Sequence, residues 1–277
     1  MRIKPLSLGF GAVVGALLVL ASFWFLSPDS RYHETAFVFQ HDSLPISGRL
    51  IQPLGEQQDP MDCVILVHGD GAMNYDAHGF FVPHFAFLAQ KDMCVLSWDK
   101  PGVEGAAGNW LSHSMADRAA LVGSAVRALK ANPELNVGNV GLMGFSQAGW
   151  VMPKVEPVAG QISFHLFVSP AVNWMRQSQY MSALRRNGEE PASEEKRIDE
   201  AVDQLLLAGA PYDDFVAFAH AESEVEETWF TKDRWVFVAK NVRADLTNDI
   251  AQLRNKPVLL LAGALDGQVD AKETMEV

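Results

Sequence analysis

One short run constrains the fold more than any other part of this sequence. The segment VGLMGFSQAG, residues 140–149, places Ser146 directly after an apolar, strand-like stretch. Gly144 lies two residues before the serine and Ala148 two residues after it, so a strand and a helix can approach closely around a sharp turn. Such a turn holds the serine in a strained conformation and exposes its hydroxyl. The run therefore predicts a strand, a turn at Ser146 and a helix.

Short apolar runs alternate with helical patterns along the chain. Strand-like segments at 35–40 and 46–52 are joined by a turn at Asp42-Ser43, and an apolar stretch at 116–130 has helical spacing. Strands buried on both faces are predicted at 63–67, 93–98, 140–143, 162–168 and 258–261. The alternation indicates an α/β fold with a mainly parallel sheet and flanking helices.

Residues 170–256 differ in character from the rest of the chain. Ile198, Val202, Leu205 and Leu206 follow a helical spacing, and Phe and Trp residues are frequent between 215 and 237. We expect a helical insertion over the sheet, which would act as a lid.

The N-terminus is predicted to lie in a membrane. Residues 6–26 carry no charge and follow Arg2 and Lys4, and a helix of this length spans about 31 Å, close to the thickness of a bilayer core. We expect residues 1–30 to anchor the domain 33–277 on the non-cytoplasmic side, in a bacterial inner membrane facing the periplasm. A cleaved signal segment and secretion are the alternative.

The charge of the chain argues against one class of partner. Asp and Glu number 34 against 22 Lys and Arg, giving a net charge of −12. A nucleic-acid interface needs a basic stripe, so no nucleic-acid partner is expected.

The two cysteines occupy matching places in two predicted strands. Cys63 stands five residues before His68, and Cys94 five residues before Asp99, so the sulfurs would lie level in neighbouring strands. A disulfide is permitted in an exported protein, but a bond directly across adjacent strands strains its geometry. Buried free thiols are therefore expected.

Four segments, in order, resemble the α/β-hydrolase superfamily, in particular its bacterial esterase-like or dienelactone-hydrolase-like members. They are VILVHGDG at 64–71, SWDKPGV at 97–103, GFSQAGW at 144–150 and PVLLLAGALD at 257–266. The resemblance implies an enzyme that cleaves carboxylic esters or related acyl bonds of small molecules through a Ser146 acyl-enzyme. It implies no cofactor and no metal.

The same resemblance assigns further residues to the site. The backbone N–H groups of Asp70 and Gln147 would form the oxyanion hole, which stabilises the charge on the carbonyl oxygen. Asp266 would be the acid that orients a catalytic histidine. Asp270 competes with it, but the spacing around Asp266 fits the family pattern better.

The histidine of that machinery has no counterpart in the expected place. The resemblance puts it tens of residues beyond Asp266, whereas no histidine follows His220 and the sequence ends at Val277. We therefore expect the C-terminal end of the domain to be incomplete, residues 258–261 to form an edge strand, and catalysis to be impaired. His113 and His78 are the first to consider as a replacement base.

Two other classes of function compete with a serine hydrolase. His68, Asp70, Asp76 and His78 have spacings that metal ligands can adopt, although the glycines at 69 and 71 fit an oxyanion turn better. The chain would alternatively be a degenerate, membrane-anchored binding protein that keeps the pocket without the chemistry.

Overall fold

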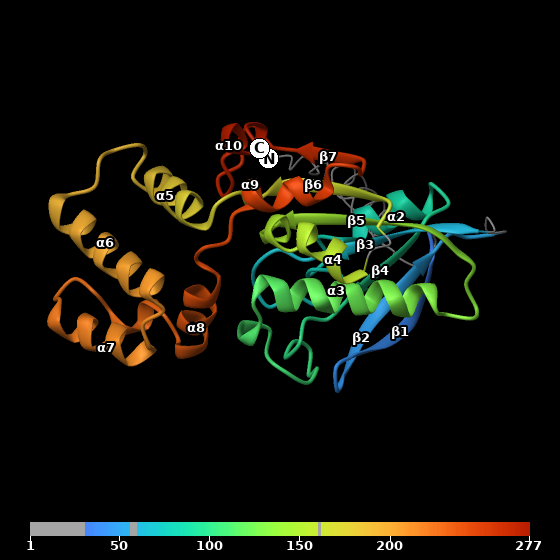
Figure 1. The fold of residues 1–277 in the computed structure, drawn as a ribbon, viewed down its shortest axis with the longest axis horizontal. Coiled ribbons are helices and arrows are strands. Elements are labelled where there is room, and N and C mark those ends of the chain that lie inside the picture. Colours follow the sequence, from blue (N-terminus) through green and yellow to red (C-terminus); the bar gives the residue numbers. More distant parts are fainter. Residues whose placement is uncertain (1–30, 56–59, 160–161) are drawn as a thin grey trace, which may run out of the picture.

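A computed structural model describes residues 31–55, 60–159 and 162–277 of the chain (Figure 1). The predicted membrane segment at 6–26 lies outside these residues. Within the described ranges, no helix is both long and apolar enough to cross a membrane.

A seven-stranded sheet forms the centre of the described chain, with the order β1-β2-β4-β3-β5-β6-β7. β1 pairs with β2, and β2 with β4, in antiparallel fashion, and the remaining pairs are parallel. The predicted mainly parallel sheet is confirmed. Its strands are β1 (His33–His41), β2 (Leu44–Gln52), β3 (Met61–Val67), β4 (Cys94–Trp98), β5 (Val137–Ser146), β6 (Phe164–Pro170) and β7 (Val258–Leu261).

Helices cover both faces of this sheet because its central strands are apolar on both sides. Ile65 and Leu96 belong to the cluster that packs under α3 (Met115–Lys130), which crosses in front of the sheet in Figure 1. Their neighbours Val64 and Val95 belong to a second cluster with α2 (Val82–Ala89). Successive strand residues point to opposite faces, so the continuous apolar runs in the sequence produce a three-layer arrangement.

The chain between β6 and β7 is a helical insertion, shown at one end of the sheet in yellow to orange in Figure 1. It contains α5 (Trp174–Arg185), α6 (Ser193–Ala208), α7 (Tyr212–Ala221), α8 (Lys232–Asn241) and α9 (Leu246–Asp249). Aromatic packing holds it together, because Phe215 stacks on Trp235 at 4.8 Å and both side chains are fully buried. We call residues 171–257 the helical insertion.

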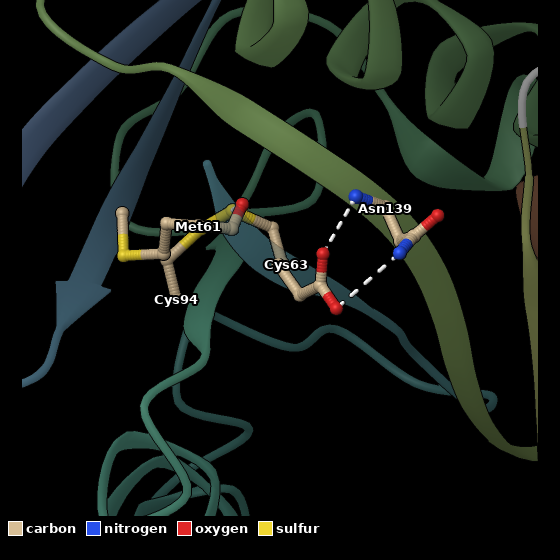
Figure 2. The surroundings of a disulfide bond; sticks show 5 residues. Met61, Cys63, Cys94 and Asn139 are labelled. Carbon is tan, nitrogen blue, oxygen red and sulfur yellow. Dashed lines mark hydrogen bonds between the residues drawn. A yellow bond between two sulfur atoms is a disulfide. The ribbon is translucent and has the colours of Figure 1, made fainter. Parts of the chain in front are cut away.

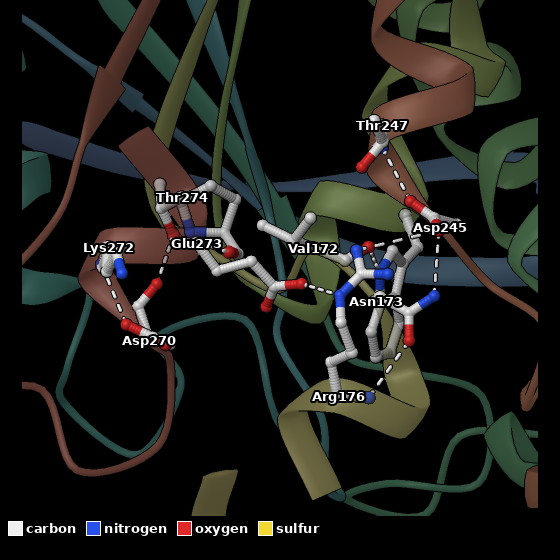
Figure 3. Close-up of polar contacts among 11 residues, drawn as sticks. Val172, Asn173, Arg176, Asp245, Thr247, Asp270, Lys272, Glu273 and Thr274 are labelled. Atoms are coloured by element: carbon white, nitrogen blue, oxygen red, sulfur yellow. Dashed lines mark hydrogen bonds and ion pairs between the residues drawn. The ribbon is translucent and has the colours of Figure 1, made fainter. Parts of the chain in front are cut away.

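The base of the helical insertion is tied to the chain that follows β7 (Figure 3). Asn173 caps α5 by accepting the Arg176 N–H, and its amide donates to Asp245 at 2.8 Å. The Arg176 side chain also pairs with Glu273 of α10 (Ala271–Met275). The start of the insertion, its end and the C-terminal helix therefore form one polar junction.

β7 is the edge strand of the sheet, as expected. It pairs with β6 alone among the described strands, and Leu259 and Leu261 are each 48% exposed. The strand predicted to be buried on both faces is thus an edge strand with one open face, which carries Leu259 and Leu261, whereas Leu260 on the other face packs partly against the core.

The prediction of free thiols at Cys63 and Cys94 is wrong, because a disulfide joins them (Figure 2). The two residues are level partners in the parallel pair β3–β4, with Cα atoms 4.4 Å apart, and both are fully buried. That separation lies within the range that disulfides span. The level placement expected from the sequence is confirmed, and the geometry of these adjacent strands permits the bond.

Candidate active site

Ser146 ends β5 in a backbone conformation that few residues adopt. Its φ is 50° and its ψ −114°, and the chain turns at once into a 3₁₀ helix, Gln147–Trp150. A positive φ costs a residue with a Cβ free energy. The predicted turn at Ser146 is present, although short 3₁₀ turns rather than one long helix follow it.

The small residues around the serine have steric reasons to be small. A Cβ added to Gly144 would lie 2.6 Å from the Ala148 Cβ and would also overlap the Met152 sulfur. A Cβ on Gly149 would lie 2.6 Å from the Ala171 carbonyl oxygen. The turn tolerates alanine at 148, where the pattern usually has glycine, because that methyl group is fully buried against Gly144.

The turn at residues 68–71, after β3, lies beside Ser146. A Cβ on Gly69 would be 3.5 Å from the Ser146 Cβ and 3.3 Å from the Phe145 carbonyl oxygen. β3 and β5 are direct neighbours in the sheet, and parallel strands end at the same edge. The sheet therefore brings Asp70 and Gln147 next to the serine.

Two hydrogen bonds fix the direction of the predicted oxyanion donors. The C=O and N–H of a trans peptide point in opposite directions. The Ser146 carbonyl accepts the Ala171 N–H at 2.8 Å, on the β6 side, so the Gln147 N–H points toward the β3 side. The Gly69 carbonyl accepts the Lys100 ammonium at 2.7 Å, so the Asp70 N–H points away from that buried group.

Ser146, Asp70 and Gln147 line one cavity of about 200 Å³. The helical insertion forms its other wall through α5 and α8. A larger cleft of about 600 Å³ shares Trp174, Ser178 and Arg234 with this cavity. The residues that complete the smaller cavity are Trp150, Ala171, Trp174, Gln177, Ser178, Met181 and Arg234.

Asp70 is the place where the helical insertion contacts the oxyanion turn. Both oxygens of its carboxylate accept hydrogen bonds from the Arg234 guanidinium of α8, at 2.9 and 2.6 Å. Burial alone would raise the pKa of Asp70, but the hydrogen bonds and charge of Arg234 outweigh it and lower the pKa. Asp70 is thus charged and bound by Arg234 through two hydrogen bonds, which also restrict the position of its backbone N–H.

Asp266 lies on the loop after β7, two strands away from β5. Burial would raise the pKa of its carboxyl, but hydrogen bonds from the N–H groups of Gln268 and Val269 and from the Ser169 hydroxyl lower it. A carboxylate held in this way stays ionised at neutral pH. Its competitor Asp270 instead caps α10, accepting the Lys272 N–H at 2.9 Å (Figure 3).

The eight histidines of the sequence all lie in the described part of the chain, and none of them lines the cavity that contains Ser146. His68 is buried and directs Nε2 at the Asn74 carbonyl at 2.9 Å. His78 directs Nε2 at the Ala72 carbonyl at 2.8 Å. His113 lines a small void behind the 68–71 turn, and burial lowers its pKa.

The residues of the metal alternative do not converge on one point. His68 and His78 use their Nε2 atoms on backbone carbonyls, and Asp70 pairs with Arg234. Across residues 31–55, 60–159 and 162–277, no group of three or more His, Cys, Asp or Glu side chains has a metal-binding arrangement.

Three cations around the 68–71 turn were not identified from the sequence. Lys100 stands in the SWDKPGV segment, which signals a turn but not a charge directed at a neighbouring turn. Arg118 interrupts a helical pattern that otherwise predicts packing alone, and Arg234 is 164 residues from Asp70 in the chain. Only the fold brings them together.

Comparison with known proteins agrees with the fold. A model of the family described as alpha/beta hydrolase matches residues 64–274. The chain therefore belongs to the α/β hydrolase family. No curated protein sequence matches it.

Several solved structures share the fold at low sequence identity. The esterase Pf2001 of Pyrococcus furiosus superposes with a TM-score of 0.57 and 16% identity, covering 90% of this chain and 79% of its own. Est1E of Butyrivibrio proteoclasticus gives 0.53 and 15%, covering 87% and 82%. The hypothetical protein PA2218 of Pseudomonas aeruginosa gives 0.55 and 14%, covering 86% and 80%.

Proposed function

We propose that this α/β hydrolase cleaves carboxylic esters of small molecules through an acyl-enzyme on Ser146. One observation carries the proposal: Ser146 has a positive φ and lines the same cavity as Asp70 and Gln147. A hydrogen bond to the preceding carbonyl fixes the direction of the N–H group of each of these two residues. This is the arrangement that acyl transfer needs, with a nucleophile and two N–H donors around one carbonyl group.

In the proposed reaction the Ser146 oxygen attacks the ester carbonyl carbon. The carbonyl oxygen becomes an oxyanion facing the N–H groups of Asp70 and Gln147. The C–O bond to the leaving group then breaks, and the serine proton ends on the released alcohol. Water attacks the acyl-serine in the second half, which releases the acid and returns a proton to the serine.

We also propose that both half-reactions are slow in this chain. Proton transfer by a positioned side chain accelerates such steps by about 10²–10⁴-fold, and no histidine lines the Ser146 cavity within the described residues. Asp266 has no imidazole to orient there. This feature also favours a second candidate function, a binding protein that keeps the pocket without the chemistry.

The substrate site is proposed to continue from Ser146 into the helical insertion, which would act as a lid. In the cleft of about 600 Å³ there, Trp174, Val202, Leu206 and Phe230 form an apolar part beside charged residues such as Arg186 and Asp199. The cleft shares Trp174, Ser178 and Arg234 with the serine cavity. These dimensions support esters with short or medium acyl groups, with the apolar part lying against α5, α6 and α8.

Labelling with a fluorophosphonate tests the mechanism in the chain as it stands. We expect slow, stoichiometric modification of Ser146, because the reagent presents a strongly electrophilic phosphorus and a P=O group suited to the oxyanion donors. Peptide mass spectrometry after overnight exposure identifies the modified residue. Modification elsewhere, or none after unlimited exposure, would support the binding protein instead.

For localisation, we propose that residues 6–26 anchor the protein and that the domain faces a non-cytoplasmic compartment. The disulfide between Cys63 and Cys94 supports an oxidising compartment. After expression of the full chain in bacteria, alkaline carbonate extraction is expected to leave it in the membrane pellet. Recovery of a shortened species in the soluble fraction would indicate cleavage of the segment and secretion.

A further inference from the structure

Lys100 is a buried cation with backbone carbonyls as partners. It is 4% exposed, and its ammonium donates to the carbonyl oxygens of Gly69 and Gly71, each at 2.7 Å. The ammonium also lies 4.7 Å from the centre of the Trp110 ring. Burying a charge is unfavourable unless hydrogen bonds replace the lost water, and the two carbonyls provide such bonds. Because a neutral residue would avoid this cost, the charge of Lys100 indicates a role that a neutral residue would not perform.

Arg118, from the first turn of α3, is a second cation on the same turn. Its guanidinium donates to the His68 carbonyl at 2.6 Å and reaches the Gly69 carbonyl at 3.4 Å. It also donates to the side-chain oxygen of Gln147. One side chain therefore connects the 68–71 turn to the residue that follows Ser146.

Neither cation forms an ion pair among the described residues, although a carboxylate is close. Asp70 uses both of its oxygens on Arg234. Lys100 and Arg118 instead donate to carbonyls around the turn, those of His68, Gly69 and, after Asp70, Gly71. Their hydrogen-bonding capacity is directed at the backbone.

We propose that Lys100 and Arg118 are positioning residues that aim the Asp70 N–H, and through Gln147 the second donor, at the substrate oxyanion. The proposal rests on the function proposed above for Ser146. Because the Gly69 C=O is pulled toward the two cations, the N–H of the same peptide is turned the opposite way. Two positive charges on the carbonyl side also polarise that peptide, which strengthens its N–H as a donor.

The geometry explains why the turn needs cations rather than neutral donors. Developing negative charge is stabilised best by dipoles that are already oriented and do not reorganise. The 68–71 turn contains two glycines, and Gly71 has a φ of 94°, so its own backbone restricts its shape weakly. The ammonium and the guanidinium supply the missing restraint from the interior of the domain.

The test compares acylation of Ser146 in two variants of Lys100. The limiting rate and the half-saturating concentration are measured with p-nitrophenyl acetate under single-turnover conditions, with peptide mass spectrometry to quantify the adduct on Ser146. Lys100→Met is expected to lower the limiting rate by about 10²–10³-fold, the usual effect of losing one oxyanion donor, with little change in half-saturation. Lys100→Arg is expected to restore most of the rate. Lys91→Met, at an exposed lysine, is the matched control.

The pH profile supplies a readout that a purely structural role would not move. Burial and the nearby charge of Arg118 lower the pKa of Lys100 well below its usual value. The charged or titratable groups around it are His68, His113, Asp70, Arg118 and Arg234. Without an internal base, acylation of a serine rises with pH. In the parent chain the rise should flatten where Lys100 loses its proton, at a pH below the usual range for lysine.

The two variants separate this effect from other titrations. Lys100→Arg should extend the rise to higher pH, and Lys100→Met should show no such inflection. Thermal unfolding shows whether each variant is folded. The pH profile of acylation in the parent chain is measured without any substitution.

Each outcome decides between the inference and the function on which it rests. A folded Lys100→Met variant that acylates Ser146 at the parental rate, or a parent profile whose inflection persists unchanged in Lys100→Arg, overturns the inference and leaves the serine mechanism intact. A parent chain that is never acylated at Ser146 overturns the proposed function itself.

Discussion

Replacement of Ser146 by alanine is expected to abolish covalent acylation of the protein. The parent chain should gain one acetyl group from p-nitrophenyl acetate, because Ser146 is held in a strained turn beside two fixed peptide N–H groups. The acyl-enzyme should accumulate, since attack by water also lacks a base. The Ser146→Ala variant should lose both the acetyl group on the peptide that contains residue 146, as measured by peptide mass spectrometry, and the burst of p-nitrophenolate.

In the Ser146→Ala variant, the steady-state rate of ester hydrolysis should fall far less than the burst of p-nitrophenolate. Members of a catalytic unit act together, so that once one is missing, removal of another costs little turnover. A large loss of steady-state turnover in Ser146→Ala would therefore show that a base does act on the serine. His113 and His78 would then be the first residues to replace.

Ser146→Cys is the matched control for that conclusion. A cysteine is a few per cent ionised at neutral pH and needs a base less than serine does. In a cavity without a base, the cysteine variant should therefore acylate faster than the parent. Slower acylation by a folded cysteine variant would argue that the serine is activated after all.

Removal of the disulfide is expected to lower the free energy of unfolding by about 4 kcal/mol. Cys63 and Cys94 are 31 residues apart in sequence, and the chain-entropy estimate for a loop of this size gives that value. For a domain of this length the melting temperature should fall by about 10 °C. Thermal and urea unfolding of the Cys63→Ala/Cys94→Ala double variant measure both quantities.

The parent chain in a thiol reductant is the control for the double variant. It loses the cross-link but keeps both sulfur atoms, so any extra loss in the alanine variant reports the space left by the sulfurs in the core. Equal melting temperatures for the oxidised parent, the reduced parent and the double variant would contradict a stabilising cross-link.

Much of the fold could be predicted because its signals are local. The mainly apolar runs at 63–67 and 93–98, of which only the second contains a polar residue, the buried Ser97, became β3 and β4, since a strand buried on both faces has few polar positions. The turn at Ser146 could equally be predicted, because small residues stand two positions before and two positions after it, at 144 and 148. Such features depend on neighbours a few residues away.

Whether the two cysteines form a disulfide could not be predicted from local sequence. Their equal distance from the strand ends showed that they lie level, but not that their Cα atoms would be 4.4 Å apart. That separation depends on how two twisted strands meet, which side-chain types do not encode.

What the sequence by itself determined is the succession of elements along the chain: a mainly parallel sheet, a serine at a strained turn, and helices inserted before the last strand. What only the tertiary structure decided is the surroundings of that serine. Lys100, Arg118 and Arg234 reach the 68–71 turn from the end of β4, from α3 and from α8, as far as 164 residues away. A charge in the sequence carries no sign of its partner, because a hydrogen bond depends on distances of a few ångströms that the packing of distant elements sets.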